Sequence, residues 1–136
     1  MLPAGYLMDS GALYDQSRGY GWTLKPKSTE SNVNLDQRLD TYVYVTNTAT
    51  ATWNYTLPPG NYLVTVVVGS PIYTGVHTVA VEGVTVIKAA PTGSGQFVEL
   101  LDYPATVSDG QLTITIGGSG DDKKTKLCYL IIKPAT

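Results

Sequence analysis

Residues 51–68 read ATWNYTLPPGNYLVTVVV, two strand-like runs joined by a proline–glycine turn. In the first run, hydrophobic residues at odd positions from Ala51 to Leu57 alternate with polar residues, the two-residue period of a strand with one solvated face. The second run, residues 62–68, is hydrophobic at both parities, which is typical of a central strand covered on both faces. Residues 58–61, PPGN, suit a tight turn, so we predict a hairpin.

Runs of the same kind recur on both sides of this hairpin. They lie at 42–45, 76–82, 84–88, 97–103, 111–116 and 127–132, separated by Gly, Pro, Asn and Asp at intervals of about 8–12 residues. The sequence shows no window with a helical period and no internal repeat. We therefore predict an all-β fold, a jelly-roll β-sandwich of two antiparallel sheets with about eight or nine strands and little helix.

Composition narrows the classes of function. The chain has 136 residues, 43% of them hydrophobic and 15% charged, with a net charge of −2 and one cysteine. This length suits one domain, the charge disfavours nucleic-acid binding, and one cysteine forms no internal disulfide. No run reaches the roughly 20 apolar residues of a membrane span. We expect residues 1–136 to be a single module excised from a longer protein. The first residues after Met1 read like the middle of a longer sequence, and residues 134–136 resemble the start of a linker.

The residues that could support catalysis are few. The single histidine, His77, shares its parity with Val79 and Val81, which predicts a structural residue on the inward face of a strand. There is no Gly-x-Ser-x-Gly motif and Cys128 lies within a strand, so we expect no enzyme. No cofactor is expected to be required. A structural calcium ion is the metal that dispersed acidic residues such as Asp9, Asp40 and Glu82 would suit, although they do not have the spacing of an EF-hand loop.

Charged side chains give one set of candidate ligand-binding residues. Five of the seven lysines lie in two stretches: Lys25 and Lys27, and Lys123, Lys124 and Lys126. If the fold brings these stretches to one end, they form a cationic patch matched to a carboxylated ligand. The alternative is a pair of solvated loops in which Asp121 and Asp122 cancel part of the charge.

Aromatic residues give the second set. Tyr20 and Trp22 lie in the glycine-spaced segment RGYGW, residues 18–22, and Tyr73 lies in the segment GSPIYTG, residues 69–75. An aromatic face can stack on a sugar while a charged group such as Arg18 binds its hydroxyls. For Trp22 an equally good interpretation is a plug at the end of the sandwich.

The chain resembles the malectin-like, galactose-binding-type β-sandwich modules of bacterial carbohydrate-active and cell-surface proteins. The resemblance covers nearly the whole chain and lies in the order of its motifs rather than in any one of them. These are GYLMDSG at 5–11, RGYGW at 18–22, RLDT at 38–41, LPPGNY at 57–62 after Trp53, GSP at 69–71, VAVEGV at 79–84, VSDGQLTI at 107–114 and KLCYLII at 126–132.

The resemblance implies a jelly roll that binds carbohydrate through loops at one end, as a non-catalytic module attached to an enzyme. The family's loop aromatics resemble Tyr20 and Tyr73, its second-loop arginine resembles Arg38, and the acidic residue before its last strand resembles Asp121 or Asp122. The run GDDKKTK, residues 120–126, is more basic than the short polar loop of the family, and it favours an acidic ligand over a neutral disaccharide.

Together these observations predict a carbohydrate-binding module for plant cell-wall polysaccharide, favouring pectic homogalacturonan through the lysines and aromatic stacking. We expect a secreted or cell-surface location within a larger bacterial protein, an appended catalytic domain, a monomeric state, no nucleic-acid partner and no membrane span. Three alternatives stay open: a module for neutral β-glucan, xylan or galactan, a small polysaccharide lyase that uses a Lys, Arg or Tyr base, and a structural or adhesive domain.

Overall fold

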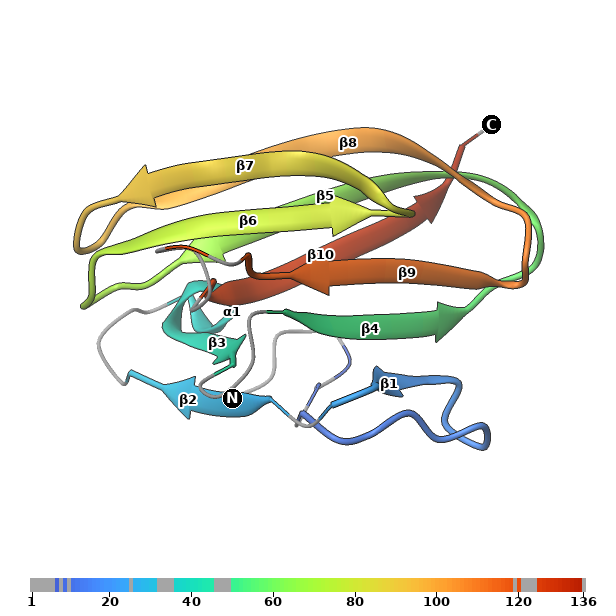
Figure 1. Cartoon of the computed structure of the whole chain (residues 1–136), viewed down its shortest axis with the longest axis horizontal. Helices are drawn as coiled ribbons and strands as arrows, with labels where there is room; N and C mark the ends of the chain where they lie inside the picture. The colour runs from blue at the N-terminus through green and yellow to red at the C-terminus, as the bar shows by residue number, and fades with distance from the viewer. Residues whose placement is uncertain are drawn as a thin grey trace.

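The computed structural model describes residues 7, 9, 11–24, 26–31, 36–45, 50–118, 120 and 125–135 (Figure 1). Within these residues the chain forms ten strands and one helical turn. They are β1 (Tyr20–Trp22), β2 (Lys27–Glu30), α1 (Gln37–Asp40), β3 (Thr41–Tyr44), β4 (Ala51–Thr56), β5 (Gly60–Gly69), β6 (Gly75–Val81), β7 (Val84–Thr92), β8 (Phe97–Val107), β9 (Gln111–Ile116) and β10 (Leu127–Pro134).

The strands form two antiparallel sheets of five strands each. The first has the order β1-β4-β9-β6-β7 and the second the order β2-β3-β10-β5-β8. The predicted hairpin is wrong, because β4 and β5 lie in different sheets and the proline–glycine turn between them connects the two sheets. The sheets lie one over the other in Figure 1, so the predicted all-β sandwich of two antiparallel sheets is confirmed. In the described chain no helix is long and apolar enough to cross a membrane.

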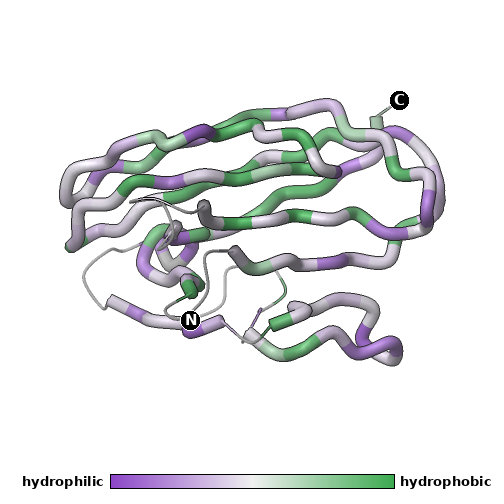
Figure 2. The backbone as a smooth tube through the Cα atoms, viewed as in Figure 1, coloured by the Kyte–Doolittle hydropathy of each residue, from purple (hydrophilic) through white to green (hydrophobic). Residues whose placement is uncertain are grey.

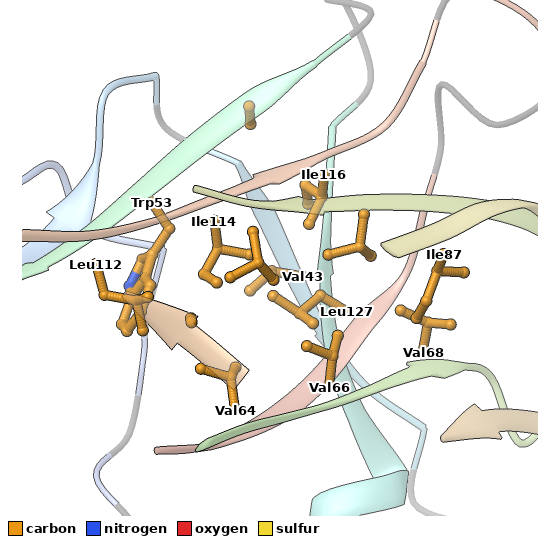
Figure 3. Packing of buried hydrophobic residues seen from close by; sticks show 14 of the residues in the cluster. Val43, Trp53, Val64, Val66, Val68, Ile87, Leu112, Ile114, Ile116 and Leu127 are labelled. Atoms are coloured by element: carbon orange, nitrogen blue, oxygen red, sulfur yellow. The ribbon is translucent and has the colours of Figure 1, made fainter. Parts of the chain in front are cut away.

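The core lies between the sheets and follows the predicted alternation. Leu112, Ile114 and Ile116 of β9 are fully buried and face the valines of β5, as Figure 3 shows for Val64 and Val66. Hydrophobic residues recur along the strands of both sheets in Figure 2, whereas the turn before β1 is hydrophilic. Burial of this apolar area is the main favourable contribution to folding.

The central strand β5 confirms the prediction of a strand covered on both faces. Val64, Val66 and Val68 belong to the core cluster, while Val67, with the opposite parity, is also fully buried but lies outside that cluster. β5 pairs with β10 on one side and with β8 on the other. β5 is therefore an interior strand of its sheet, and it carries buried residues on both faces.

The structure extends two predicted strands through prolines. β8 continues through Pro104 to Val107, and β7 continues through Pro91 to Thr92. Each is the edge strand of its sheet. A proline lacks an N–H donor, and on an edge strand it can face the unpaired side, where the sheet loses no hydrogen bond. The turn between β6 and β7 is confirmed at Glu82 and Gly83, which have φ angles of 50° and 80°, both in the left-handed region that a two-residue hairpin turn requires.

Candidate functional site: a cationic and aromatic end of the sandwich

The predicted ligand-binding residues within the described chain fall at opposite ends of the sandwich. Arg18 and Tyr20 lie at the end where β4 turns into β5, because Thr56 N donates to Gly19 O at 2.7 Å. Lys126 lies where β5 finishes, because Gly69 N donates to its carbonyl oxygen at 3.0 Å. The ten residues of β5 separate these ends by about 30 Å. A single site at one end therefore cannot include both groups.

Lys126 borders both ends of the loop formed by residues 70–74. Besides the Gly69 hydrogen bond, its Nζ lies beside Gly75, where a Cβ atom would come within 3.3 Å of it. Its backbone N–H donates to His77 Nδ1 at 3.2 Å. The start of β10 thus fixes this lysine against the β5–β6 connection, and its ammonium group lies at the loop.

His77 is a buried structural residue, as the strand parity predicted, and its relative exposure is 0%. Because Nδ1 accepts the Lys126 N–H, the ring proton belongs on Nε2, which donates to Thr92 Oγ1 at 2.9 Å. Burial lowers the pKa of His77 to about 4, and the Lys126 charge lowers it further. The imidazole is therefore neutral near pH 7, and the positive charge beside it is that of Lys126.

Tyr73 lies on the loop beside Lys126 with 59% of its surface exposed. Its backbone N–H and that of Ile72 both donate to Ser70 Oγ at 3.1 Å, which holds the loop in a tight turn. Tyr42 lies near Tyr73 and Ser70. Burial raises the pKa of Tyr42, and the nearby Tyr73 raises this pKa further, whereas a hydrogen bond with the Ser70 side chain lowers it. An exposed aromatic side chain therefore stands on a tight loop, and the Lys126 ammonium lies beside the end of that loop at Gly75.

Arg38 lies in α1 and is held by its neighbours. Its Nε and Nη2 donate to the two carboxylate oxygens of Asp36 at 3.1 and 2.9 Å, and its guanidinium lies 4.8 Å from the centroid of the Tyr129 ring. The Arg38 side chain lowers the pKa of Asp36. The resemblance placed Arg38 among the ligand-binding residues, but in the structure its planar fork already binds a carboxylate, so its first role is to fix α1 on β10.

Arg18 and Tyr20 form a cluster at the far end. The Tyr20 ring stacks on Tyr55 with centroids 5.7 Å apart and planes 10° apart, and it lies 6.3 Å from Trp53. The Arg18 guanidinium lies 5.1 Å from the Tyr20 centroid. The sequence predicted a glycine-spaced loop here, but Tyr20 begins strand β1, which pairs with β4.

Trp22 leaves the set of candidate ligand-binding residues. Only 1% of its surface is exposed, and its Nε1–H donates to Asp9 Oδ2 at 2.8 Å. Burial raises the pKa of Asp9, and the hydrogen bonds from Gly11 and Trp22 oppose that rise. The ring is part of the core, so it offers no face to a sugar and matches the alternative interpretation of a plug.

The remaining predicted residues are mostly outside the part that the structure describes. Lys25, Asp121, Lys123 and Lys124 lie outside the described residues. Lys27 is exposed, but it starts strand β2 rather than lying in a loop, and it pairs with Tyr44. Among the described residues, no three His, Cys, Asp or Glu side chains group as a metal site.

The sequence did not predict which residues contact the candidate side chains at the two ends of the sandwich. Tyr42, Tyr129 and Asp36 were not singled out, and Tyr55 was assigned to the core alone. A usable signal existed for Tyr42, since it alternates with the core residues Val43 and Val45. For Tyr55 and Tyr129 the contact depends on strand pairing over long sequence distances, which no local pattern contains, whereas Asp36 contacts Arg38 only two residues along the chain.

Neither Cys128 nor His77 is set up for nucleophilic chemistry. Burial raises the pKa of the Cys128 thiol to about 12, and its Sγ donates to Gly69 O at 3.3 Å. His77 is buried and bonded at both ring nitrogens. A thiolate and an exposed imidazole base are what a Cys–His mechanism needs, and neither residue supplies one.

No protein-family model and no curated protein matches the sequence. Solved structures do match. Protein YxiM of Bacillus subtilis has a TM-score of 0.73 and 26% identity over 100% of this chain, which spans 38% of the YxiM chain. A family 35 carbohydrate-binding module from Clostridium thermocellum has a TM-score of 0.51 and 14% identity, covering 86% of this chain and 93% of that one.

A third similar structure carries such a module within an enzyme. The Podospora anserina GH26–CBM35 β-(1,4)-mannanase has a TM-score of 0.52 and 11% identity, covering 87% of this chain and 28% of that one. At these identities the two family 35 likenesses show the fold, which is the β-sandwich of carbohydrate-binding modules. The malectin-like assignment stays a prediction.

Proposed function

We propose that this protein is a non-catalytic carbohydrate-binding module that binds polysaccharide at the end of the sandwich around Lys126 and Tyr73. The observation that carries the proposal is the placement of Lys126 against both ends of the loop on which Tyr73 is exposed. An exposed ring can stack on the C–H face of a sugar, and the adjacent ammonium can bind its polar substituents.

The ligand we propose is an acidic pectic polymer such as homogalacturonan. The polymer carries one carboxylate on each sugar, one of which would pair with Lys126, and the sequence places Lys123 and Lys124 three and two positions before it. Arg38 would add to the local positive potential only in part, because Asp36 binds its guanidinium at 2.9 Å. A repeating anionic ligand gains from several such cations at once, and its binding weakens as salt screens the charges.

The biological role we propose is proximity. A module of this kind would hold an appended catalytic domain near its polymeric substrate and so raise the effective concentration without new chemistry. The similar structure of the Podospora anserina mannanase, which joins a family 35 module to a glycoside hydrolase, supports this arrangement. The corresponding location is secreted or at the cell surface.

Affinity electrophoresis tests the ligand class. The purified protein is run in gels that contain polygalacturonate, esterified pectin, xylan or β-glucan, each with and without added salt. We expect retardation by polygalacturonate that salt relieves. Retardation by a neutral polymer that is indifferent to salt would contradict the acidic ligand, and no retardation by any polymer would overturn carbohydrate binding.

Two variants test the site in the same gels. Lys126→Gln removes the charge and Tyr73→Ala removes the ring, and each should weaken binding to polygalacturonate about tenfold, as one charge-assisted pair or one stacked ring is worth about 1–2 kcal/mol. Lys88→Gln is the matched control, since Lys88 is an exposed lysine of β7. An equal loss of affinity for polygalacturonate in the Lys126 and Lys88 variants would contradict the assignment of the site. Release of ultraviolet-absorbing unsaturated products from polygalacturonate would show a lyase instead.

A further inference from the structure

The loop of residues 70–74 starts from a backbone that is held on both sides. On the β10 side, Gly69 N donates to Lys126 O at 3.0 Å. On the other side, Ser70 O accepts the N–H of Gly95, in the turn between β7 and β8, at 3.0 Å. The first residue of the loop, Ser70, therefore has a fixed main chain.

The Ser70 hydroxyl is used entirely inside the protein. Ser70 has a relative exposure of 0%, and its Oγ accepts the backbone N–H groups of Ile72 and Tyr73, both at 3.1 Å. A hydroxyl oxygen has two lone pairs and one proton, so these bonds occupy both lone pairs. The proton is left for Tyr42, with which the Ser70 side chain also hydrogen-bonds.

The exposed part of the loop depends on these bonds, because packing does not hold it. Tyr73 is 59% exposed and Ile72 is 40% exposed, and neither belongs to the core cluster. Side chains that bury little apolar surface do little to restrict the loop. The bonds to Ser70 Oγ therefore order it, and a loop that is ordered before a ligand arrives loses less conformational entropy on binding.

We propose that Ser70 is a positioning residue of the Lys126 end of the sandwich, whose hydroxyl holds the Tyr73 loop in its binding conformation before the ligand arrives. This inference rests on the proposed function, in which Tyr73 and Lys126 contact an acidic polysaccharide. Ser70 is buried, so it acts through the loop and does not touch the sugar. The main-chain pairing at Gly69 and Gly75 does not involve the hydroxyl, so its removal frees the middle of the loop and leaves both ends in place.

Amide hydrogen exchange of Ser70→Ala, measured by nuclear magnetic resonance without ligand, tests whether the hydroxyl orders the loop. The Ile72 and Tyr73 amides should exchange about tenfold faster than in the wild-type protein, because they lose their acceptor. The Gly95 amide is the internal control, since its acceptor is the main-chain oxygen of Ser70, which the substitution keeps. Unchanged exchange at Ile72 and Tyr73, or equal acceleration at Gly95, would overturn the proposal.

Affinity electrophoresis in polygalacturonate gels tests the role in binding. Ser70→Ala should bind about tenfold more weakly than the wild-type protein, because the ligand must then order the loop. Ser70→Thr keeps the hydroxyl and should recover most of the affinity, together with the slow exchange of the Ile72 and Tyr73 amides. Recovery of both would distinguish the hydroxyl from the mere bulk of the side chain.

Asp109→Ala is the matched control, because it removes another side-chain acceptor of a backbone N–H, that of Gln111 at 3.1 Å, in the turn between β8 and β9 at the opposite end. It should keep the wild-type affinity, since its charge lies about the length of β5 away, well beyond the Debye length of about 8 Å. Equal affinity of Ser70→Ala and the wild-type protein would overturn the role of Ser70 alone. No retardation of the wild-type protein would overturn the proposed function as well.

Discussion

At the scale of single residues, His77 couples the core of this protein to its cationic end. One ring nitrogen accepts the backbone N–H of Lys126 and the other donates to Thr92, so the imidazole joins β6, β7 and the start of β10. Only the neutral imidazole can make both bonds, because the cationic form has no acceptor nitrogen. The position of Lys126 therefore depends on the protonation state of a buried ring.

This dependence predicts a loss of stability in acid. The pKa of His77 is about 4 in the folded protein against 6.5 ordinarily. Between these values the unfolded chain binds a proton that the folded chain does not, so the free energy of unfolding falls as the pH falls from about 6.5 to about 4, by about 3 kcal/mol in total. Urea unfolding measured across this range gives the value.

The control for this prediction is His77→Asn, which has no group that titrates in the window. Carboxylates of the protein titrate in both proteins, so the difference between the two pH profiles isolates the histidine. The variant should start less stable, because it alters a fully buried site, but lose less on acidification. Parallel profiles would show that His77 does not bind its proton more weakly in the folded state.

At the scale of elements, the strands with a hydrophobic pattern were predictable and the polar edge strands were not. β4, β5 and β9 follow their alternation or their continuous hydrophobic run, because burial between two sheets requires it. β2 reads KSTE and β1 reads YGW, segments of four and three residues without a two-residue period. They exist because they pair with β3 and β4, and this pairing is not local in sequence.

The two ends of the molecule were predictable to different degrees for the same reason. Tyr73 and Lys126 were chosen from exposed residue types in loop-like segments, which needs only local pattern. That Lys126 contacts both ends of the Tyr73 loop depends on the pairing of β10 with β5. The separation of Arg18 from Tyr73 by the length of β5 could not be known before the topology.

Gly21 tests the docking of β1, on which the Tyr20 cluster depends. Its φ is 148°, and a Cβ atom there would lie 2.6 Å from the backbone of Tyr14. Gly21→Ala should destabilise the protein by about 3 kcal/mol, because backbone atoms cannot yield as a flexible side chain would. Thermal unfolding followed by circular dichroism measures the effect.

Gly83→Ala is the control for this change. Gly83 also has a left-handed φ, 80°, but a Cβ atom there would meet nothing within 4 Å. It should cost about 1 kcal/mol, the strain of the backbone alone. Equal costs at the two glycines would mean that the contact of β1 with residues 13–14 contributes no steric constraint.

At the scale of the whole molecule, the sandwich holds two chemically different ends on one rigid body. The Lys126 end combines a cation with an exposed ring, and the Arg18 end packs a guanidinium on a cluster of rings. Since β5 spans the distance between them at about 30 Å, one short oligosaccharide cannot reach both.

The most direct test of the central claim is to map where trigalacturonate binds by the amide shifts of the isotope-labelled protein. The predicted result is a set of shifts at Gly69, Tyr73, Gly75 and Lys126 that vanish in Lys126→Gln and weaken with salt, with no shift at Gly19 or Tyr20. Shifts confined to Gly19 and Tyr20, or no shifts at all, would contradict it.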